Sequence, residues 1–437
     1  MKKFLILFVL LSMTVSIHAQ SSNKKQLSDK ELLTEVQRQT FKYFWDFAHP
    51  VSGLARERNN SVRLPDHGVV TIGGSGFGVM ALIVGVERQF ITRSQAVERM
   101  LKILLFLDTA DHFHGIWPHW MNGATGETVP FSRKDDGADL VESAFMFEGL
   151  LTAHQYFNEN TPEERRIRNL INKLWREAEW NFFTRDGQET LYWHWSPNHG
   201  WSMNHRIHGF NECHIVYILA AASPTYPIQE NVYHRGWANS NVFINNREYY
   251  GIKLQLGPEY GGPLFFSHYS YLGLDPRGLK DRYADYWEQM VNHTLINRQY
   301  CIENPDKHKL YGPKCWGLTA SDGDKGYSAH SPTNDRGVIT PTAALSAFPY
   351  TPQYSMEALR YFYEKLGDKL WGEYGFRDAF NPDQDWFAPS YLAIDQGPII
   401  VMIENYRSQL LWNLFMSHPD VRAGLIKLGF TSPHFNK

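Results

Sequence analysis

Cysteine is scarce in this chain. Its 437 residues include only Cys213, Cys301 and Cys315, so at most one disulfide can form and one thiol must remain. The spacing permits a bridge between Cys301 and Cys315, and three buried thiols are an equal alternative. Disulfides therefore supply at most one crosslink.

Runs of positive charge are also missing. The chain has 43 Lys and Arg residues against 46 Asp and Glu residues, with no basic block that could neutralise phosphates. We therefore expect no nucleic acid partner. No Pro/Gly/Ser-rich linker or low-complexity segment divides the chain, and we expect one domain over residues 20–437.

A long apolar run occurs only at the N-terminus. Lys2 and Lys3 precede an apolar stretch from Phe4 to Val15, and the small residue Ala19 follows, as in a cleaved secretory signal over residues 1–19. No later run approaches the roughly 18 to 20 residues needed to span a bilayer. The pattern predicts an exported, soluble chain, which we expect to be periplasmic and monomeric.

Several motifs of metal, nucleophile and phosphate sites are absent. There is no HExxH, no complete EF-hand loop and no GxSxG, and "SDGDKG" (321–326) lacks the later ligands of a calcium loop. "GGSGFG" (73–78) does not satisfy GxGxxG, and close helix packing explains its glycines better. We expect neither a catalytic metal nor a cofactor.

Aromatic residues, in contrast, are abundant at 15 % of the chain. They exceed what an ordinary core requires, so we expect some to line a solvated site.

The chain also alternates two kinds of helix. Amphipathic helices with a charged face, expected on an outer surface, are predicted at 28–47, 92–107, 161–180, 280–300 and 355–371. Helices that are apolar nearly all round, and so must be surrounded by protein, are predicted at 75–86, 143–153, 213–222, 340–348 and 397–406.

This alternation predicts an all-α fold, an (α/α)6 toroid in which an outer ring of helices encloses an inner ring. Residues 225–279 look like a degenerate sixth pair, and 417–428 like a last helix. Outer-to-inner links are long, as at 113–138 and 304–339, and short hairpins are conceivable there because 190–197 alternates like a strand. Since helix direction alternates, all long loops fall on one face, where binding and catalysis usually reside.

Carboxylates stand repeatedly where inner helices begin. Asp139 and Glu142 start one inner helix after Asp135, Glu212 starts another, and Asp395 precedes a third. Helix capping is the structural alternative, because Asp139 with Glu142 three residues later is close to a capping box. Three inner helices that deliver acids to one rim favour a functional site over three independent caps.

Glycoside hydrolysis suits several acids in an aromatic cleft, because it needs one protonated and one ionised carboxyl group beside a sugar. Candidate platforms for sugar rings in the long loops include Trp193, Trp195, Trp316 and Tyr327. Candidate hydroxyl-binding groups are His205, Arg206, Asn211, Arg336 and Arg377. Core packing is the alternative for each aromatic residue.

Five stretches resemble the glucoamylase-like family of bacterial (α/α)6 barrels, specifically glycoside hydrolase family 144. They are "DLVESAFMFEGLLTA", "GFNECHIVYILAAASP", "WGLTASDG", "ITPTAALSAFPYTP" and "YLAIDQGPIIVMIENYRS". The resemblance implies inverting hydrolysis of β-1,2-glucan, by endo cleavage or by release of sophorose, without a cofactor. The name glucoamylase is a fold analogy and assigns no substrate.

The resemblance maps the catalytic acids to Asp139, Glu142, Glu212 and Asp395. We expect Glu212 to be the acid and Asp395 the base, with Asp139 and Glu142 holding the sugar; a catalytic Glu142 is the open alternative. Two rival functions also remain open: hydrolysis of an α-glucan or another glucan on the same barrel, and non-catalytic glycan binding.

Overall fold

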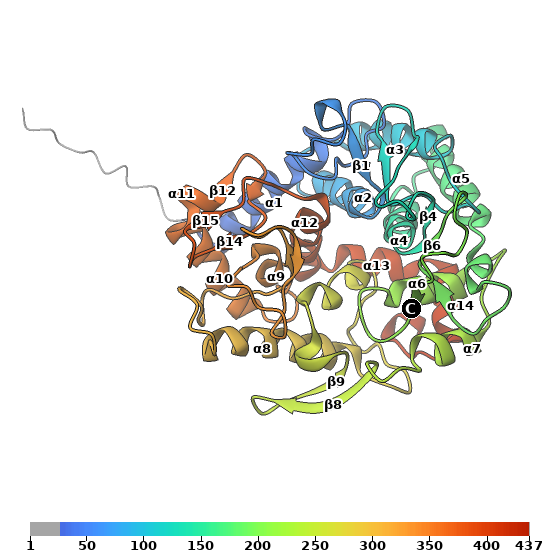
Figure 1. The fold of residues 1–437 in the computed structure, drawn as a ribbon. Coiled ribbons are helices and arrows are strands. Elements are labelled where there is room, and N and C mark those ends of the chain that lie inside the picture. Colours follow the sequence, from blue (N-terminus) through green and yellow to red (C-terminus); the bar gives the residue numbers. More distant parts are fainter. Residues whose placement is uncertain (1–26, 437) are drawn as a thin grey trace, which may run out of the picture.

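A computed structural model describes residues 27–436. The predicted leader at 1–19 lies outside the described residues. Successive helices alternate between an outer and an inner position around one axis, and Figure 1 looks into the resulting ring. The predicted all-α (α/α)6 toroid is confirmed. None of the described helices combines the length and the apolar character that crossing a membrane requires.

The outer helices carry the charged faces that the sequence predicts. Their bounds are α1 Asp29–Trp45, α3 Arg93–Leu107, α5 Pro162–Glu177, α7 Glu230–Val232, α8 Tyr286–Glu303 and α10 Pro352–Lys365. Ser28 and Thr92 complete capping boxes at the starts of α1 and α3.

The inner helices are buried almost all round. Their bounds are α2 Ile72–Glu87, α4 Leu140–Tyr156, α6 His214–Ala222, α9 Pro341–Leu345 and α12 Ala393–Ser408. In the remaining inner position, between α6 and α9, the chain forms the 3₁₀ turns Leu264–Ser267 and Tyr269–Tyr271. Its outer partner α7 continues as a π-helical turn, Tyr233–Trp237, so the predicted degenerate pair is shorter and less regular than a helix pair.

Several predicted boundaries were wrong. The helix predicted at 280–300 begins at Tyr286, because Asp285 caps it. The helix predicted at 355–371 ends at Lys365, and a separate turn, α11 Gly367–Leu370, follows. The predicted last helix corresponds to α14 Pro419–Lys427, whereas the preceding helix α13 Leu410–Ser417 was not expected.

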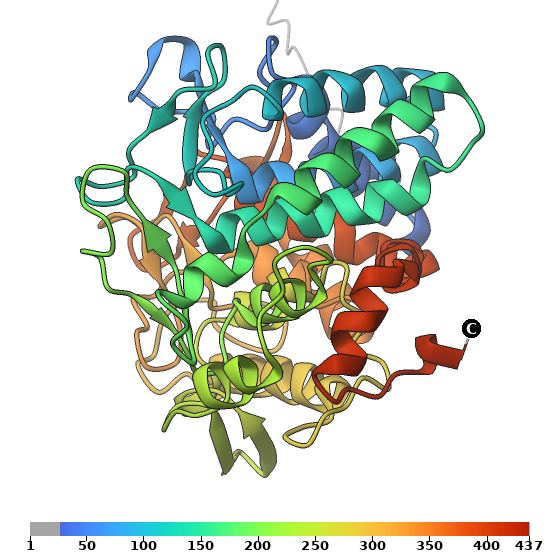
Figure 2. The same ribbon diagram turned by 90° about the vertical axis from the view of Figure 1, so that its right-hand side faces the viewer.

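Short antiparallel strands reinforce the long loops. They are β1 Val69–Thr71, β2 Trp120–Asn122, β3 Thr128–Val129, β4 Ala138–Asp139, β5 Leu191–Tyr192, β6 His194–Trp195, β7 Arg206–Ile207, β8 Ile244–Tyr249, β9 Ile252–Leu256, β10 Ala320–Ser321, β11 Ser328–Ala329, β12 Trp371–Gly372, β13 Gly375–Phe376, β14 Phe380–Asn381 and β15 Trp386–Phe387. β5 pairs with β7 and β6 pairs with β4, so the strand-like stretch 190–197 joins two different ladders. In Figure 2 many of these loops gather at the left-hand ends of the helices, while the C-terminus lies on the right.

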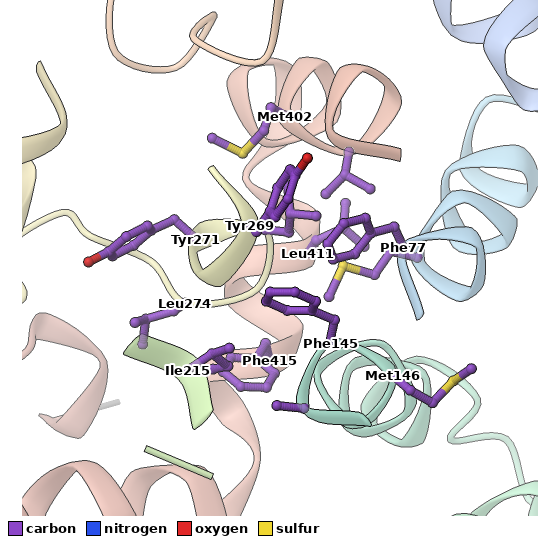
Figure 3. Close-up of a cluster of buried hydrophobic side chains, with 14 of the residues drawn as sticks. Phe77, Phe145, Met146, Ile215, Tyr269, Tyr271, Leu274, Met402, Leu411 and Phe415 are labelled. Carbon is purple, nitrogen blue, oxygen red and sulfur yellow. The ribbon is translucent and has the colours of Figure 1, made fainter. Parts of the chain in front are cut away.

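Aromatic rings fill the centre of the ring of helices. Phe77 of α2, Phe145 of α4 and Tyr269 converge there in Figure 3, with ring centroids 5.4 to 5.7 Å apart. Phe415 of α13 packs in the same cluster. All three cysteines are buried and free, so the bridge between Cys301 and Cys315 does not form. The core rests on packing, and it supports the floor of the cavity described next.

Candidate active site

A cavity of about 370 Å³ lies where the inner helices begin. Its walls come from widely separated parts of the chain: Glu57, Arg58, Thr71, His119, Trp120, Phe131, Val141, Glu142, Phe145, Trp193, Glu212, Phe265, Tyr269, Ala320, Tyr327, Leu392 and Ile394. Acidic groups and aromatic rings therefore face one space, as expected of a sugar site.

Asp139 caps α4 and also organises the cavity wall. One of its carboxylate oxygens accepts hydrogen bonds from the backbone N–H groups of Val141 and Glu142, both 3.0 Å long, and from the indole of Trp193 at 2.9 Å. The other oxygen lies 2.9 Å from Nδ1 of His119. Burial opposes ionisation, yet the hydrogen bond and charge of His119 outweigh it and lower the pKa of Asp139. Asp139 is a buried carboxylate that orients two neighbours.

His119 lines the cavity between carboxylates. Its Nε2 lies 3.9 Å from Oε1 of Glu142. Burial disfavours its charge, but Glu142, Asp139 and Asp135 raise the pKa of His119 to about 9. The site therefore holds a fixed positive charge at neutral pH, where the imidazolium can donate to a sugar oxygen or a carboxylate.

Glu142 does not complete the capping box with Asp139. Its Oε2 accepts from the backbone N–H of Gly73 at 2.9 Å, in the first turn of α2, and from the Thr71 hydroxyl at 3.4 Å. Burial raises the pKa of Glu142, His119 lowers it and Asp139 raises it, with a net rise. The carboxyl group faces the cavity and is within reach of a ligand.

Glu212 stands two residues before α6 and lines the same cavity. Burial raises its pKa to about 7, a backbone hydrogen bond opposes the shift, and the charges of Glu142 and Asp139 add to it. A carboxyl group that keeps its proton near neutral pH can act as a general acid.

Asp135 is a further buried carboxyl group at this wall. Its Oδ2 lies 3.4 Å from Nε2 of His194, and burial together with the charge of Asp139 raises the pKa of Asp135 to about 7. The structure thus brings Asp135, Asp139 and Glu142 together around His119.

Asp395 belongs to a second acidic cluster beneath the cavity. Its side chain lies in the first turn of α12, it is 1 % exposed, and it is not part of the cavity wall. Burial, the charge of Asp378 and a hydrogen bond with Asp378 raise the pKa of Asp395 well above its usual value. The hydroxyl of Tyr269, a residue of the wall, lies 3.5 Å from Oδ1 of Asp395. Asp395 and Asp378 therefore form a buried, interacting pair of carboxyl groups.

Arg58 links this cluster to the cavity. Its guanidinium donates two hydrogen bonds of 3.0 Å to Asp322, and Nε donates to Glu57 at 2.9 Å. The backbone N–H of Asp322 in turn donates to Asp378 at 2.7 Å. The site therefore contains two half-buried cations, His119 and Arg58, and each is held by carboxylates.

The predicted aromatic platforms divide into two groups. Trp193 and Tyr327 line the cavity, and Tyr327 is 53 % exposed. Trp195 instead packs against His114 and Phe182. Trp316 is 0 % exposed, so it is a core residue and the prediction of a sugar platform was wrong. Its loop turns inward because the flanking Cys315 and Leu318 are buried as well.

The predicted hydroxyl-binding residues lie outside the cavity wall. His205 stacks on Trp193 with centroids 4.9 Å apart, and Arg206 donates to the Tyr192 hydroxyl at 3.0 Å. Asn211 accepts from the backbone N–H of Cys213, ahead of α6. Arg336 is exposed, and Arg377 donates to the carbonyl of Pro389. In this structure their contacts are local.

Sequence reasoning missed His119, Trp120, Phe131, Glu57, Arg58 and Asp378. Phe131 stacks on His119 with centroids 4.3 Å apart and extends the aromatic wall. These residues occupy long loops without periodicity. Besides Asp395 itself, only the stretch "WGLTASDG", which contains Asp322, pointed to the second cluster. Their partners are distant in sequence, which no local pattern reveals.

Two groups of described residues have metal-ligand spacing: His119 with Asp135 and Asp139, and Asp306 with His308 and Asp335. In the first group both carboxylate oxygens of Asp139 carry hydrogen bonds, whereas Oδ1 of Asp135 has no hydrogen-bond partner. It acts as an acid–imidazolium cluster.

Comparisons with known proteins show which proteins this chain is similar to. A family model described as "Glycoamylase: Putative glucoamylase" matches residues 204–419. The structure of a "putative glucoamylase" from Bacteroides uniformis is 73 % identical, covers 94 % of this chain and 100 % of its own, and superposes with a TM-score of 0.92. An endo-β-1,2-glucanase from Chitinophaga pinensis, solved with sophorotriose and glucose, is 56 % identical over 94 % of this chain and 100 % of its own, with a TM-score of 0.91.

A curated relative adds a second name. The exo-β-1,2-glucooligosaccharide sophorohydrolase (non-reducing end) of Parabacteroides distasonis is 47 % identical over 93 % of this chain. The chain spans only 59 % of that relative's length. With relatives this similar over almost all of its residues, the chain belongs to the glucoamylase-like family of the glycoside hydrolase family 144 type.

Proposed function

We propose that this protein is a glycoside hydrolase that cleaves β-1,2-linked glucan with inversion at the anomeric carbon. The observation that carries the proposal is Glu212, a carboxyl group with a pKa of about 7 in an aromatic-lined cavity whose wall also contains Glu57 and Glu142. The β-1,2 linkage of the proposed substrate is taken from the names of the relatives.

In the proposed mechanism Glu212 protonates the departing glycosidic oxygen. The Asp395–Asp378 pair is the base: it holds one proton between two carboxyl groups and has room for a second. Because Asp395 lies beneath the wall, the proton of the attacking water reaches it through an intervening water or a substrate hydroxyl. Asp139, through His119 and Trp193, positions the sugar, and Glu142 accepts from a sugar hydroxyl.

Glu142 is the second candidate for the base, since its carboxyl group lies in the wall whereas that of Asp395 does not. We expect Glu212→Gln and Asp395→Asn each to lower turnover by about 10² to 10⁴-fold. Asp378→Asn should act through Asp395 and shift the acid limb of the pH profile. Asp368→Asn, an exposed acid of α11, is the matched control and should keep full activity.

Azide separates the two bases. In an inverting enzyme without its base, this anion can attack the anomeric carbon directly, so it should restore turnover of Asp395→Asn and give an α-glycosyl azide. If azide restored the turnover of Glu142→Gln but not of Asp395→Asn, Glu142 would be the base. Full activity of all the variants would place the catalytic site elsewhere.

A panel of glucans tests the substrate. We expect products from β-1,2-glucan, with the α-anomer appearing first in proton NMR, and none from starch or other β-glucans. Cyclic β-1,2-glucan has no end, so its cleavage requires endo action, whereas sophorose released only from linear chains indicates exo action. Release of glucose from starch, with no products from β-1,2-glucan, would contradict the proposal. Binding of β-1,2-glucan without cleavage would indicate a glycan-binding protein.

We further propose that residues 1–19 are removed during export to the periplasm and that the mature chain is a monomer. Lys2, Lys3 and the apolar stretch to Val15 support export. N-terminal sequencing of the periplasmic fraction should begin at Gln20, and light scattering should give the mass of one chain. A cytoplasmic chain that starts at Met1 would contradict the first part.

A further inference from the structure

A group of metal-binding side chains lies outside the cavity, where the loop after α8 meets two other loops. The ligand atoms of Asp306, His308 and Asp335 all lie within 4.8 Å of one another. Asp383, in the turn between β14 and β15, completes the surroundings. Nothing in the proposed hydrolysis uses these residues.

The imidazole of His308 is oriented so that its Nε2 can bind a metal ion. Its Nδ1 lies 2.6 Å from Oδ2 of Asp383, and Asp383 is held in turn by the backbone N–H of Lys309 at 2.8 Å. A carboxylate on Nδ1 fixes the tautomer that leaves the Nε2 lone pair free, which is the usual arrangement behind a metal-bound histidine. That Nε2 is buried and has no hydrogen-bond partner.

Asp335 presents a matching oxygen. Its Oδ1 accepts from the Tyr311 hydroxyl and from the backbone N–H of Gly337, both at 2.9 Å. Its side chain is 2 % exposed, yet Oδ2 has no hydrogen-bond partner and lies at ion-pair distance, 3.5 Å, from Nε2 of His308. Two buried polar atoms without partners aim at the same space, and leaving such atoms unsatisfied is costly.

The backbone around these groups is closely built. Asn304 ends α8 in the left-handed conformation and exchanges two hydrogen bonds of 2.8 Å with the backbone of His308. At Gly337, a Cβ would lie 2.9 Å from Nδ1 of His308. Asp306 is exposed, so its carboxylate approaches from the solvent side and leaves an entry path for an ion.

We propose that Asp306, His308 and Asp335 bind one divalent transition-metal ion of the Zn²⁺ class, with water completing its coordination. One imidazole nitrogen with two carboxylate oxygens suits Zn²⁺, whereas Ca²⁺ prefers an all-oxygen shell of six to eight ligands. The ion ties the start of the 304–340 connection to its end. The same connection carries Asp322 and Tyr327 toward the cavity, so the ion stabilises the rim of the site without entering the reaction.

Titration with ZnCl₂ tests the proposal on tag-free mature protein stripped with EDTA. Calorimetry should report one equivalent of zinc for the parent protein and at least tenfold weaker binding for His308→Gln and Asp335→Asn. Asp306→Asn, an exposed change without a folding role, should weaken binding as well. Asp383→Asn should cost about 10- to 100-fold through the orientation of His308.

Thermal unfolding gives a second readout. Zinc in large excess over its dissociation constant should raise the Tm of the stripped parent protein by roughly 2 to 5 °C and that of Asp306→Asn by less. Asp135→Asn is the matched control and should bind zinc like the parent. Binding that is lost in Asp135→Asn but kept in His308→Gln would move the site to the cavity. An absence of zinc binding, or a preference for CaCl₂, would overturn the proposal.

Discussion

At the scale of single residues, one acid can cap a helix and also take part in the candidate site. Asp139 caps α4 with one oxygen and holds His119 with the other. Glu142 caps a different helix, since it accepts from Gly73 in the first turn of α2, whose N-cap residue Thr71 provides no side-chain cap. Acids at helix starts are thus placed accurately by the same backbone groups that they satisfy.

The pKa of Glu212 makes a prediction about pH. A general acid must carry its proton, so kcat/KM should fall about tenfold per pH unit above pH 7, where Glu212 ionises. The residual activity of Glu212→Gln should lack this alkaline limb. Asp135→Asn should keep it, because Asp135 is not among the groups that shift Glu212. An alkaline limb that appears only near pH 9 would point to His119 instead.

At the scale of elements, α2 and α4 pack with almost no space between their backbones. A Cβ at Gly76 would overlap the carbonyl oxygen of Phe145 and lie 2.6 Å from the Cα of Met146, and a Cβ at Gly149 would overlap the carbonyl oxygen of Gly76. The glycines of "GGSGFG" therefore serve close helix packing, as the sequence analysis suggested. This contact places the starts of both helices, with Thr71 and Glu142, on one wall.

Gly76→Ala should therefore be strongly destabilising. The added methyl group meets backbone atoms that cannot rotate away, and we expect a loss of about 3 kcal/mol in the free energy of unfolding. Gly367→Ala is the matched control, because a Cβ there meets only atoms 3.9 Å or more away and should change stability by less than about 0.5 kcal/mol. Urea unfolding of the two variants measures both effects. Equal stability would show that the two helices can separate at little cost.

At the scale of the whole molecule, the ring must close between its first helices, α1 and α2, and its last inner helix, α12. Arg88, the C-cap of α2, donates to Glu404 of α12 in two hydrogen bonds of 2.6 and 2.7 Å. Gln37 of α1 donates to the same carboxylate at 3.1 Å. Glu404 is 1 % exposed, so three helices converge on one buried charge.

Removal of Arg88 should show how strongly the stability of the fold depends on the pairing of the buried Glu404 carboxylate. Arg88→Met leaves Glu404 without its cation and should cost about 3 to 5 kcal/mol of stability. Burial opposes the charge of Glu404, but Arg88 and Ser408 lower its pKa, so its contribution is present above pH 4.5 and is lost as pH falls through its folded pKa. Urea unfolding from pH 7 to pH 4 measures this loss. A parent and an Arg88→Met variant with parallel pH profiles would contradict the assignment.

The sequence by itself determined the helical ring, the face that carries the long loops and the acids at the starts of α4, α6 and α12. These features follow from periodicity and from the alternating direction of consecutive helices, which act over a few turns of chain. Only the tertiary structure decided which loop side chains face the cavity. Trp193 lines it and Trp316 is core, although both are loop tryptophans. Arg58 meets Asp322 across 264 residues of chain, and His119 acquires its charge from carboxylates 16 to 23 positions away. Burial and electrostatic fields are set by such distant neighbours, so no local pattern could have placed them.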